Sequence, residues 1–83
     1  MAKIKVFGAD WCEDTQRSRE QLDELGLKYD YINIDKDAAS QAWVKQQNGG
    51  KQKTPTIDVE GRIIIEPSNE QLEILLRETG AIT

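Results

Sequence analysis

Apolar and polar positions along the first third of the chain predict one strand followed by one helix. Branched and aromatic residues over positions 3–8 indicate a buried strand that ends at Gly8. The polar stretch over positions 12–25 carries apolar residues one turn apart, at Leu22 and Leu25. We therefore expect an amphipathic helix in this stretch.

The next strand is expected over residues 27–35, with apolar side chains on both of its faces. Tyr29 and Tyr31 belong to one face, and Ile32 and Ile34 belong to the other. Such a strand is typical of a sheet that is covered on both sides.

The second half of the chain predicts a helix, a hairpin and a last helix. The expected elements are a helix at 37–47, strands at 56–59 and 62–65, and a helix from Ser68 to about residue 79. Asp35 or Asp37 caps the first of these helices, and Glu60-Gly61 joins the two strands. The apolar residues expected to be buried are Ala38, Ala39, Ala42, Trp43 and Val44 in the first helix and Leu72, Ile74, Leu75 and Leu76 in the last.

The order βαβαββα predicts one α/β domain over residues 1–83. A right-handed crossover makes the first two strands parallel, whereas the hairpin strands are antiparallel. Helices are needed on both faces to cover the apolar side chains. We expect a four-stranded mixed sheet with the first strand in a central position.

Composition excludes several classes of function. The 83 residues include one cysteine and no histidine, which excludes an internal disulfide and a zinc site of the usual Cys/His kind. We expect a cytoplasmic protein, because small secreted domains usually carry several disulfides. The chain has no apolar run of membrane-spanning length. Its net charge of −4 argues against nucleic acid as a partner.

The one cysteine stands where the first strand gives way to the first helix. The unpaired N–H groups and the dipole of a helix N-terminus favour a thiolate over a thiol. Asp10 and Glu13 around Cys12 have the spacing of a capping box, with Asp10 as the N-cap. The alternative is that Cys12 is a small buried hydrophobe, but Asp10, Glu13 and Asp14 are charges that favour contact with water.

A second candidate segment is Thr54-Pro55-Thr56, just before the hairpin. The bond before Pro55 is either an ordinary trans bond at the start of a strand or a cis bond. A cis bond would turn the backbone of Thr54 outward, where its N–H and C=O can pair with an extended ligand.

Four motifs in this order resemble those of glutaredoxins in the thioredoxin superfamily, and the mycoredoxin-like branch in particular. The corresponding segments are Trp11 to Thr15, Asn48-Gly49-Gly50, Thr54-Pro55-Thr56 and Glu66-Pro67-Ser68. The resemblance spans nearly the whole chain. It implies the thioredoxin fold and a cis bond before Pro55.

The resemblance also implies a thiol–disulfide oxidoreductase with Cys12 as the nucleophile. Its substrates would be mixed disulfides between proteins and a small thiol, glutathione or mycothiol, which serves as co-substrate. No metal or tightly bound cofactor is implied, and we expect a monomer. The implied binding residues are Trp11, Lys53, Thr54, Pro55, Ser68 and Asn69. Lys45, Lys51 and Lys53 are candidates for binding a carboxylate of the small thiol, although solvated surface charge explains them equally well.

The chain departs from the family pattern at Thr15, where a second cysteine is usual. Thr15 cannot resolve a disulfide, so only a monothiol mechanism remains, in which a second small thiol regenerates Cys12. We expect Thr15 to take part by donating a hydrogen bond to the Cys12 sulfur. The alternative is that it caps or packs in the first helical turn.

The second departure is the negative charge around the cysteine. Asp10, Glu13 and Asp14 oppose the helix N-terminus, so we expect a thiol that is less acidic than a typical glutaredoxin's. Arg17 lies one turn from Glu13 and is its expected partner. The same charge is expected to favour basic or neutral substrates.

Two other functions remain open at this stage. One is an iron–sulfur carrier, in which Cys12 from two subunits and two small thiols hold a cluster. The Cys-Gly-Phe-Ser turn of the glutaredoxins that do so is absent. The other is a redox-silent or sensing domain that binds a partner peptide, for which Cys12→Ser would leave binding intact.

Overall fold

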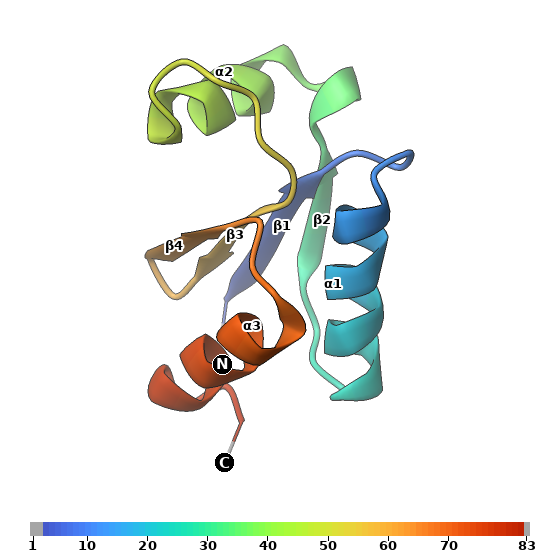
Figure 1. Ribbon diagram of the computed structural model, residues 1–83, viewed down its shortest axis with the longest axis vertical. Coiled ribbons are helices and arrows are strands. Elements are labelled where there is room, and N and C mark those ends of the chain that lie inside the picture. The colour runs from blue at the N-terminus through green and yellow to red at the C-terminus, as the bar shows by residue number, and fades with distance from the viewer. Residues whose placement is uncertain (1–2, 83) are drawn as a thin grey trace.

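The centre of the sheet is strand β1, as the sequence predicted. The computed structural model describes residues 3–82. Its elements are β1 (Ile4–Gly8), α1 (Glu13–Glu24), β2 (Asp30–Asn33), the 3-10 turn η1 (Ile34–Lys36), α2 (Ala38–Gln47), β3 (Thr56–Val59), β4 (Arg62–Ile65) and α3 (Asn69–Glu78). The strand order is β2-β1-β3-β4, with β1 and β2 parallel and the other pairs antiparallel (Figure 1).

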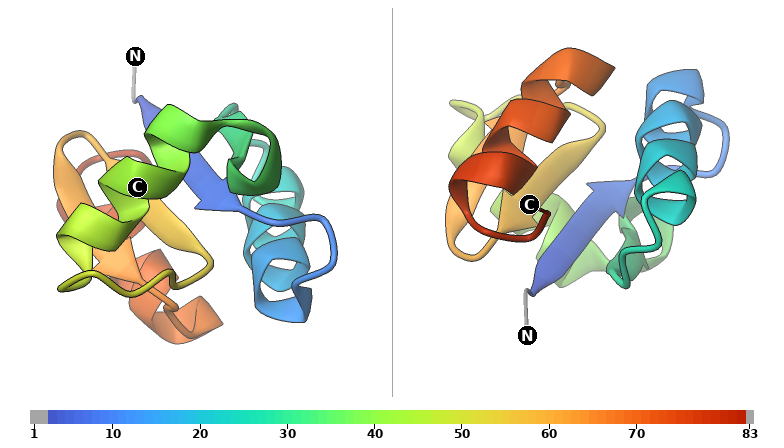
Figure 2. Two further views of the ribbon diagram at one scale, coloured as in Figure 1. Left: turned by 90° about the horizontal axis from the view of Figure 1, so that it is seen from above. Right: turned by 90° about the horizontal axis from the view of Figure 1, so that it is seen from below.

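Helices cover both faces of this sheet, which confirms the thioredoxin-type architecture. Helices α1 and α3 lie on one face and α2 lies on the other (Figure 2). The larger core cluster joins the sheet to α1 and α3 through Ile4, Val6, Leu22, Ile57, Val59, Leu72, Leu75 and Leu76. The smaller one, beneath α2, is built from Phe7, Ile34 and Val44.

Two apolar residues that were expected in the core are exposed. Ile74 is 50% exposed, because it lies two positions from both Leu72 and Leu76 and so faces the opposite side of α3. Leu25 is 38% exposed, because α1 ends at Glu24.

The second strand and second helix also differ from expectation. Strand β2 is shorter than predicted, because the Asn33 side chain accepts a hydrogen bond from the Asp35 N–H (3.0 Å) and starts η1. Asp37 is the cap of α2, and Val44 is the buried member of its apolar set. Ala38, Ala39 and Ala42 face solvent, while Trp43 is half-buried.

The helices of the described residues include none that is long and apolar enough to cross a membrane.

A matched pair of truncations on α3 tests this assignment of the core. We expect Leu72→Ala to lower the free energy of unfolding by about 2–5 kcal/mol, because it removes a fully buried side chain. Ile74→Ala should cost under about 1 kcal/mol. Urea denaturation of both variants measures the difference, and equal losses would contradict the packing described here.

Candidate functional site

The loop between β1 and α1 positions Cys12 as the residue that precedes the helix. The Cys12 N–H donates to the Ala9 carbonyl (3.1 Å), and Cys12 is the N-cap of α1. The predicted capping box at Asp10 is therefore wrong. The helix begins later than its spacing implied, and the Asp10 carboxylate instead accepts a hydrogen bond from the Tyr31 hydroxyl (2.7 Å).

Thr15 fixes the start of α1 against the end of β1. Its side chain is fully buried, and its Oγ1 lies 3.5 Å from the Ala9 nitrogen. A Cβ atom on Gly8 would stand 2.6 Å from the same oxygen, so this close approach requires glycine. Thr15 therefore packs in the first turn of α1, where it also lies near the cysteine sulfur.

The segment at Pro55 meets Cys12 directly. The bond between Thr54 and Pro55 is cis, as the resemblance implied. The Cys12 Sγ donates to the Thr54 carbonyl at 3.6 Å. Pro55 is buried, and its carbonyl accepts from the Glu66 N–H (2.8 Å). The loop before β3 thus brings Thr54 to the sulfur.

The surroundings of Cys12 favour its ionised form. Burial raises the pKa of the thiol, but the side chains of Thr54 and Thr15 lower it, as do the backbone N–H groups of Thr15 and Asp14. The result is a pKa below the ordinary value for cysteine. Both Thr15 and the helix N-terminus therefore stabilise the thiolate.

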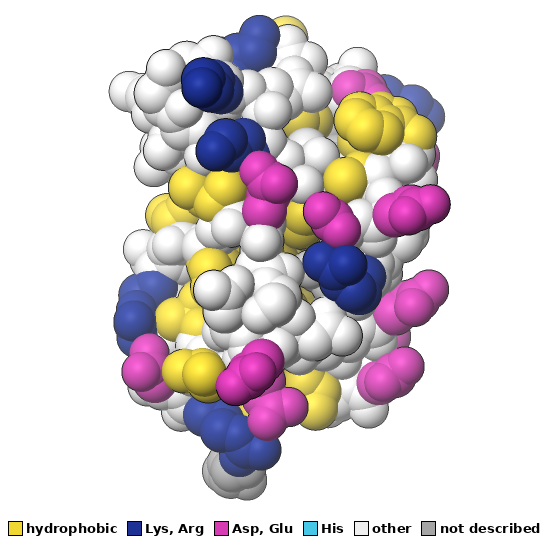
Figure 3. All heavy atoms as spheres, viewed as in Figure 1, with side chains coloured by type: hydrophobic (Ala, Val, Ile, Leu, Met, Phe, Trp, Pro, Cys, Tyr) yellow, Lys and Arg dark blue, Asp and Glu magenta, His cyan; other side chains and the backbone are white. Residues whose placement is uncertain are grey.

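The carboxylates near Cys12 have other partners than expected. Arg17 pairs with Asp14 at 3.1 Å and not with Glu13, since Asp14 lies three residues before it on the helix. Neither Asp10 nor Glu13 is among the groups that shift the pKa of Cys12 in the described part of the chain. That the thiol is less acidic than a typical glutaredoxin's therefore stays a prediction. Acidic side chains nevertheless line this side of the molecule (Figure 3).

Trp11 stands beside the cysteine and is mostly in solvent. Its ring is 70% exposed, and its indole Nε1 donates to the Asp35 carboxylate at 2.8 Å. Asp35 and Tyr31 were not among the predicted site residues. Parallel pairing of β1 with β2 in the register Gly8↔Asn33 brings both close to the loop after β1. The sequence predicted the parallel pairing but not its register.

The other predicted binding residues lie farther from the sulfur. Ser68 caps α3, where its Oγ accepts from the Gln71 N–H (3.1 Å), and the two residues form the expected capping box. The Asn69 carbonyl accepts from the Gln21 side chain (2.7 Å). Gln21 is nine residues beyond Cys12, or about 13 Å along the helix axis. The N-terminus of α3 is thus bonded to α1 about two and a half helical turns beyond Cys12.

Lys53 is exposed in the loop before Thr54, and its carbonyl accepts from the Thr56 hydroxyl (2.9 Å). Lys45 and Lys51 are exposed as well.

Among the described residues, no cluster of three or more His, Cys, Asp or Glu is placed to hold a metal ion.

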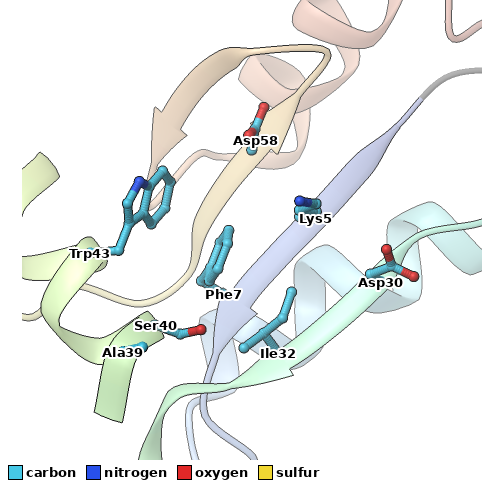
Figure 4. Close-up of a pocket in the computed structure, with 8 residues that line it drawn as sticks. All are labelled: Lys5, Phe7, Asp30, Ile32, Ala39, Ser40, Trp43 and Asp58. Atoms are coloured by element: carbon cyan, nitrogen blue, oxygen red, sulfur yellow. The ribbon is translucent and has the colours of Figure 1, made fainter. Parts of the chain in front are cut away.

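A hollow of about 630 Å³ lies on the α2 face of the sheet, apart from these residues. Phe7 and Trp43 form its apolar part, with ring centroids 4.5 Å apart, and Lys5, Asp30 and Asp58 its charged part (Figure 4). None of the predicted site residues lines it.

Comparison with known proteins identifies the family. The model of the glutaredoxin family matches residues 4–64. The chain belongs to the glutaredoxin family. This glutaredoxin is 33% identical over 57 residues to mycoredoxin 1 of Corynebacterium glutamicum. The aligned segment covers 69% of this chain and 70% of that relative.

Solved structures agree with this assignment. A buckwheat glutaredoxin in complex with glutathione is 28% identical, with a TM-score of 0.72 over 96% of this chain and 81% of that one. A glutaredoxin of Archaeoglobus fulgidus, 22% identical, shares the fold with a TM-score of 0.75 over 93% and 88% of the two chains. The protein is a thiol oxidoreductase of the glutaredoxin family. The matched segment includes Cys12 and Thr54, whereas Ser68 and Asn69 lie beyond it.

The role of Thr54 at the sulfur is testable by pH-dependent alkylation of Cys12. Thr54→Val removes the hydroxyl that stabilises the thiolate, so the pKa of Cys12 should rise and alkylation near neutral pH should slow. Thr79→Val, which removes a hydroxyl bonded to the Leu75 carbonyl on α3, is the control. An unchanged alkylation curve for Thr54→Val would contradict this assignment.

Proposed function

We propose that this glutaredoxin reduces mixed disulfides between proteins and a small thiol by a monothiol mechanism. The observation that supports it best is the position of the one cysteine. Cys12 caps the N-terminus of α1, faces the Thr54 carbonyl at 3.6 Å, and is followed three residues later by a buried threonine. The site thus combines an activated sulfur with no second thiol.

In the first step, the Cys12 thiolate attacks the small-thiol sulfur of the mixed disulfide. A disulfide forms between Cys12 and the small thiol, and the protein sulfur leaves as a thiolate that takes up a proton. In the second step, the thiolate of a free small thiol attacks the small-thiol sulfur on Cys12. The small-thiol disulfide departs, and Cys12 is again a thiolate. Electrons balance because one mixed disulfide and one free small thiol become one protein thiol and one small-thiol disulfide.

Binding of the small thiol is assigned to the backbone of Thr54, with Pro55 and Lys53 around it, while Trp11 borders the sulfur on the other side and is available to the protein half of the substrate. Ser68 and Asn69 would contact only the far end of an extended ligand. The peptide-like ligand would pair with the Thr54 backbone as an added strand does. We expect a monomer in a reducing compartment such as the cytoplasm.

Glu66 favours a small thiol that carries no carboxylate. Its N–H bonds to the Pro55 carbonyl, so its backbone lies next to the cis-proline segment, and its side chain is exposed to solvent. It also adopts a φ of +47°, a conformation that suits asparagine better than glutamate. Mycothiol is a sugar-based thiol without a carboxylate, whereas glutathione has two. The similarity to mycoredoxin 1 also supports mycothiol over glutathione. We therefore propose mycothiol as the co-substrate.

Turnover of a small mixed disulfide tests the mechanism. Wild type, Cys12→Ser and Thr15→Cys are compared with glutathione, mycothiol or dithiothreitol as the reductant. We expect turnover with a monothiol by wild type, the highest rate with mycothiol, and none for Cys12→Ser.

Thr15→Cys restores a second thiol at a buried position next to Cys12. It should add reduction of protein disulfides, which needs a resolving cysteine, while wild type lacks that activity. Absence of turnover by folded wild type with every reductant would contradict the proposed function.

The role of Glu66 has a matched control within the chain. Glu66→Asn should raise turnover with glutathione several-fold relative to mycothiol, because it removes the opposing charge. Glu60 also has a positive φ, of 55°, but it lies in the β3–β4 hairpin beside Lys3, at the opposite end of β1 from Cys12.

Glu60→Asn is therefore the control variant. Glu66→Asn and Glu60→Asn relieve the same backbone conformation, and either should stabilise the fold by up to about 1 kcal/mol. Only Glu66→Asn should change the ratio of the rates with the two thiols. An equal ratio in both variants would show that Glu66 does not select the thiol.

A further inference from the structure

Trp11 offers an open aromatic face beside the reactive sulfur. It is more exposed than the other large apolar side chains described as exposed, Leu25, Ile63 and Ile74. Its edge is nevertheless held, because Nε1 donates to Asp35 at 2.8 Å. A ring fixed at its edge and open on its face can receive a ligand without losing much conformational entropy.

Two carboxylates near this ring are held by neutral hydrogen-bond donors. Asp10 accepts from the Tyr31 hydroxyl at 2.7 Å. Burial and the bond to Asp10 raise the pKa of Tyr31 to about 12, so the phenol stays neutral at physiological pH. The indole N–H that binds Asp35 is also neutral. Both hydrogen bonds therefore orient a carboxylate and leave its negative charge in place.

The neighbouring cations do not cancel this charge. Arg17 forms an ion pair with Asp14 at 3.1 Å. The Arg19 guanidinium lies 3.8 Å from the centre of the Tyr31 ring and donates to the Tyr29 hydroxyl (3.3 Å), so its hydrogen-bond partner is a tyrosine and not a carboxylate. Lys36 adds one positive charge after Asp35, but Glu13 is exposed at the start of α1. In Figure 3 a hydrophobic patch over the loop between β1 and α1 borders Asp and Glu side chains together with a Lys or Arg side chain.

We propose that Trp11, Asp10 and Asp35 dock a cationic side chain, arginine or lysine, of the protein substrate close to its disulfide-bonded cysteine. A guanidinium or ammonium stacks on an indole face, and arginine in addition matches carboxylates in geometry. This inference rests on the proposed function, since it names the class of protein that the Cys12 site serves.

The position of this surface in the sheet leaves room for both halves of the substrate. Trp11 is held by Asp35 on the β2 side of β1, whereas Cys12 meets Thr54 on the β3 side. The two neighbours of β1 lie on opposite sides of it. The protein half of a mixed disulfide thus occupies the β2 side while the small thiol occupies the β3 side.

Peptide mixed disulfides that differ in one residue next to the cysteine test the proposal. One carries arginine and the other citrulline, which keeps the shape and loses the charge. We expect wild type to have a kcat/KM about three- to ten-fold higher for the arginine peptide at low salt. Because exposed charges are screened, the preference should shrink at ~1 M salt.

Asp10→Asn and Asp35→Asn keep an oxygen that accepts the existing hydrogen bonds but remove the charge. Each should reduce the preference, and the double variant should abolish it. Glu24→Gln, an exposed carboxylate at the far end of α1, is the matched control and should keep the preference. Equal kcat/KM for the two peptides in wild type would overturn the proposal.

A binding measurement separates this proposal from the proposed function. Cys12→Ser is titrated with the same peptides, their cysteines replaced by serine, and the NMR signal of the Trp11 indole N–H is followed. The arginine peptide should shift that signal at concentrations several-fold lower than the citrulline peptide. If neither peptide disulfide is turned over but the shift keeps this preference, the proposed function fails and the docking surface stands. Equal shifts would overturn the docking surface even if turnover is normal.

Discussion

The contact between the Cys12 sulfur and the Thr54 carbonyl, at 3.6 Å, joins the two segments on which the site depends. It exists because β1 pairs antiparallel with β3 in the register Phe7↔Thr56, so that the loop after β1 and the loop before β3 meet at the same end of the sheet. The close approach of Gly8 to Thr15 sets where α1 begins relative to that edge. The N-terminus of α1 is thereby aimed at the sulfur, where its N–H groups stabilise a thiolate.

Most of the fold was predictable, because local signals and topology agreed. The Glu60-Gly61 hairpin, the Ser68 capping box and the apolar faces of the strands each indicated the element that formed. The start of α1 was not predictable from the spacing of Asp10 and Glu13, since the tertiary bond from Tyr31 removes Asp10 from the cap. The exposure of Ile74 reflects its angle on α3, which composition alone does not give.

The candidate site was predictable in its chemistry but less so in its electrostatics. Cys12, Thr15 and Thr54 meet as expected. The carboxylates were predicted to oppose the thiolate, yet Asp14 pairs with Arg17, and Asp10 and Asp35 accept hydrogen bonds from neutral donors. The partners Tyr31, Trp11 and Arg17 come from strand β2, the loop between β1 and α1, and the next turn of α1. Each of these carboxylates is therefore held by a partner in the fold, and the charge of Asp10 and Asp35 is what the proposed docking of a cationic side chain uses.

The monothiol mechanism is tested most directly by the intact mass of the protein after one reaction with a mixed disulfide. The two halves of this disulfide are chosen to differ in mass. We expect one adduct, on Cys12, with the mass of the small-thiol half. A single free thiol should remove this adduct. Release of the peptide as a free thiol should accompany that adduct. An adduct with the mass of the peptide half, or no adduct on folded protein, would contradict the monothiol mechanism.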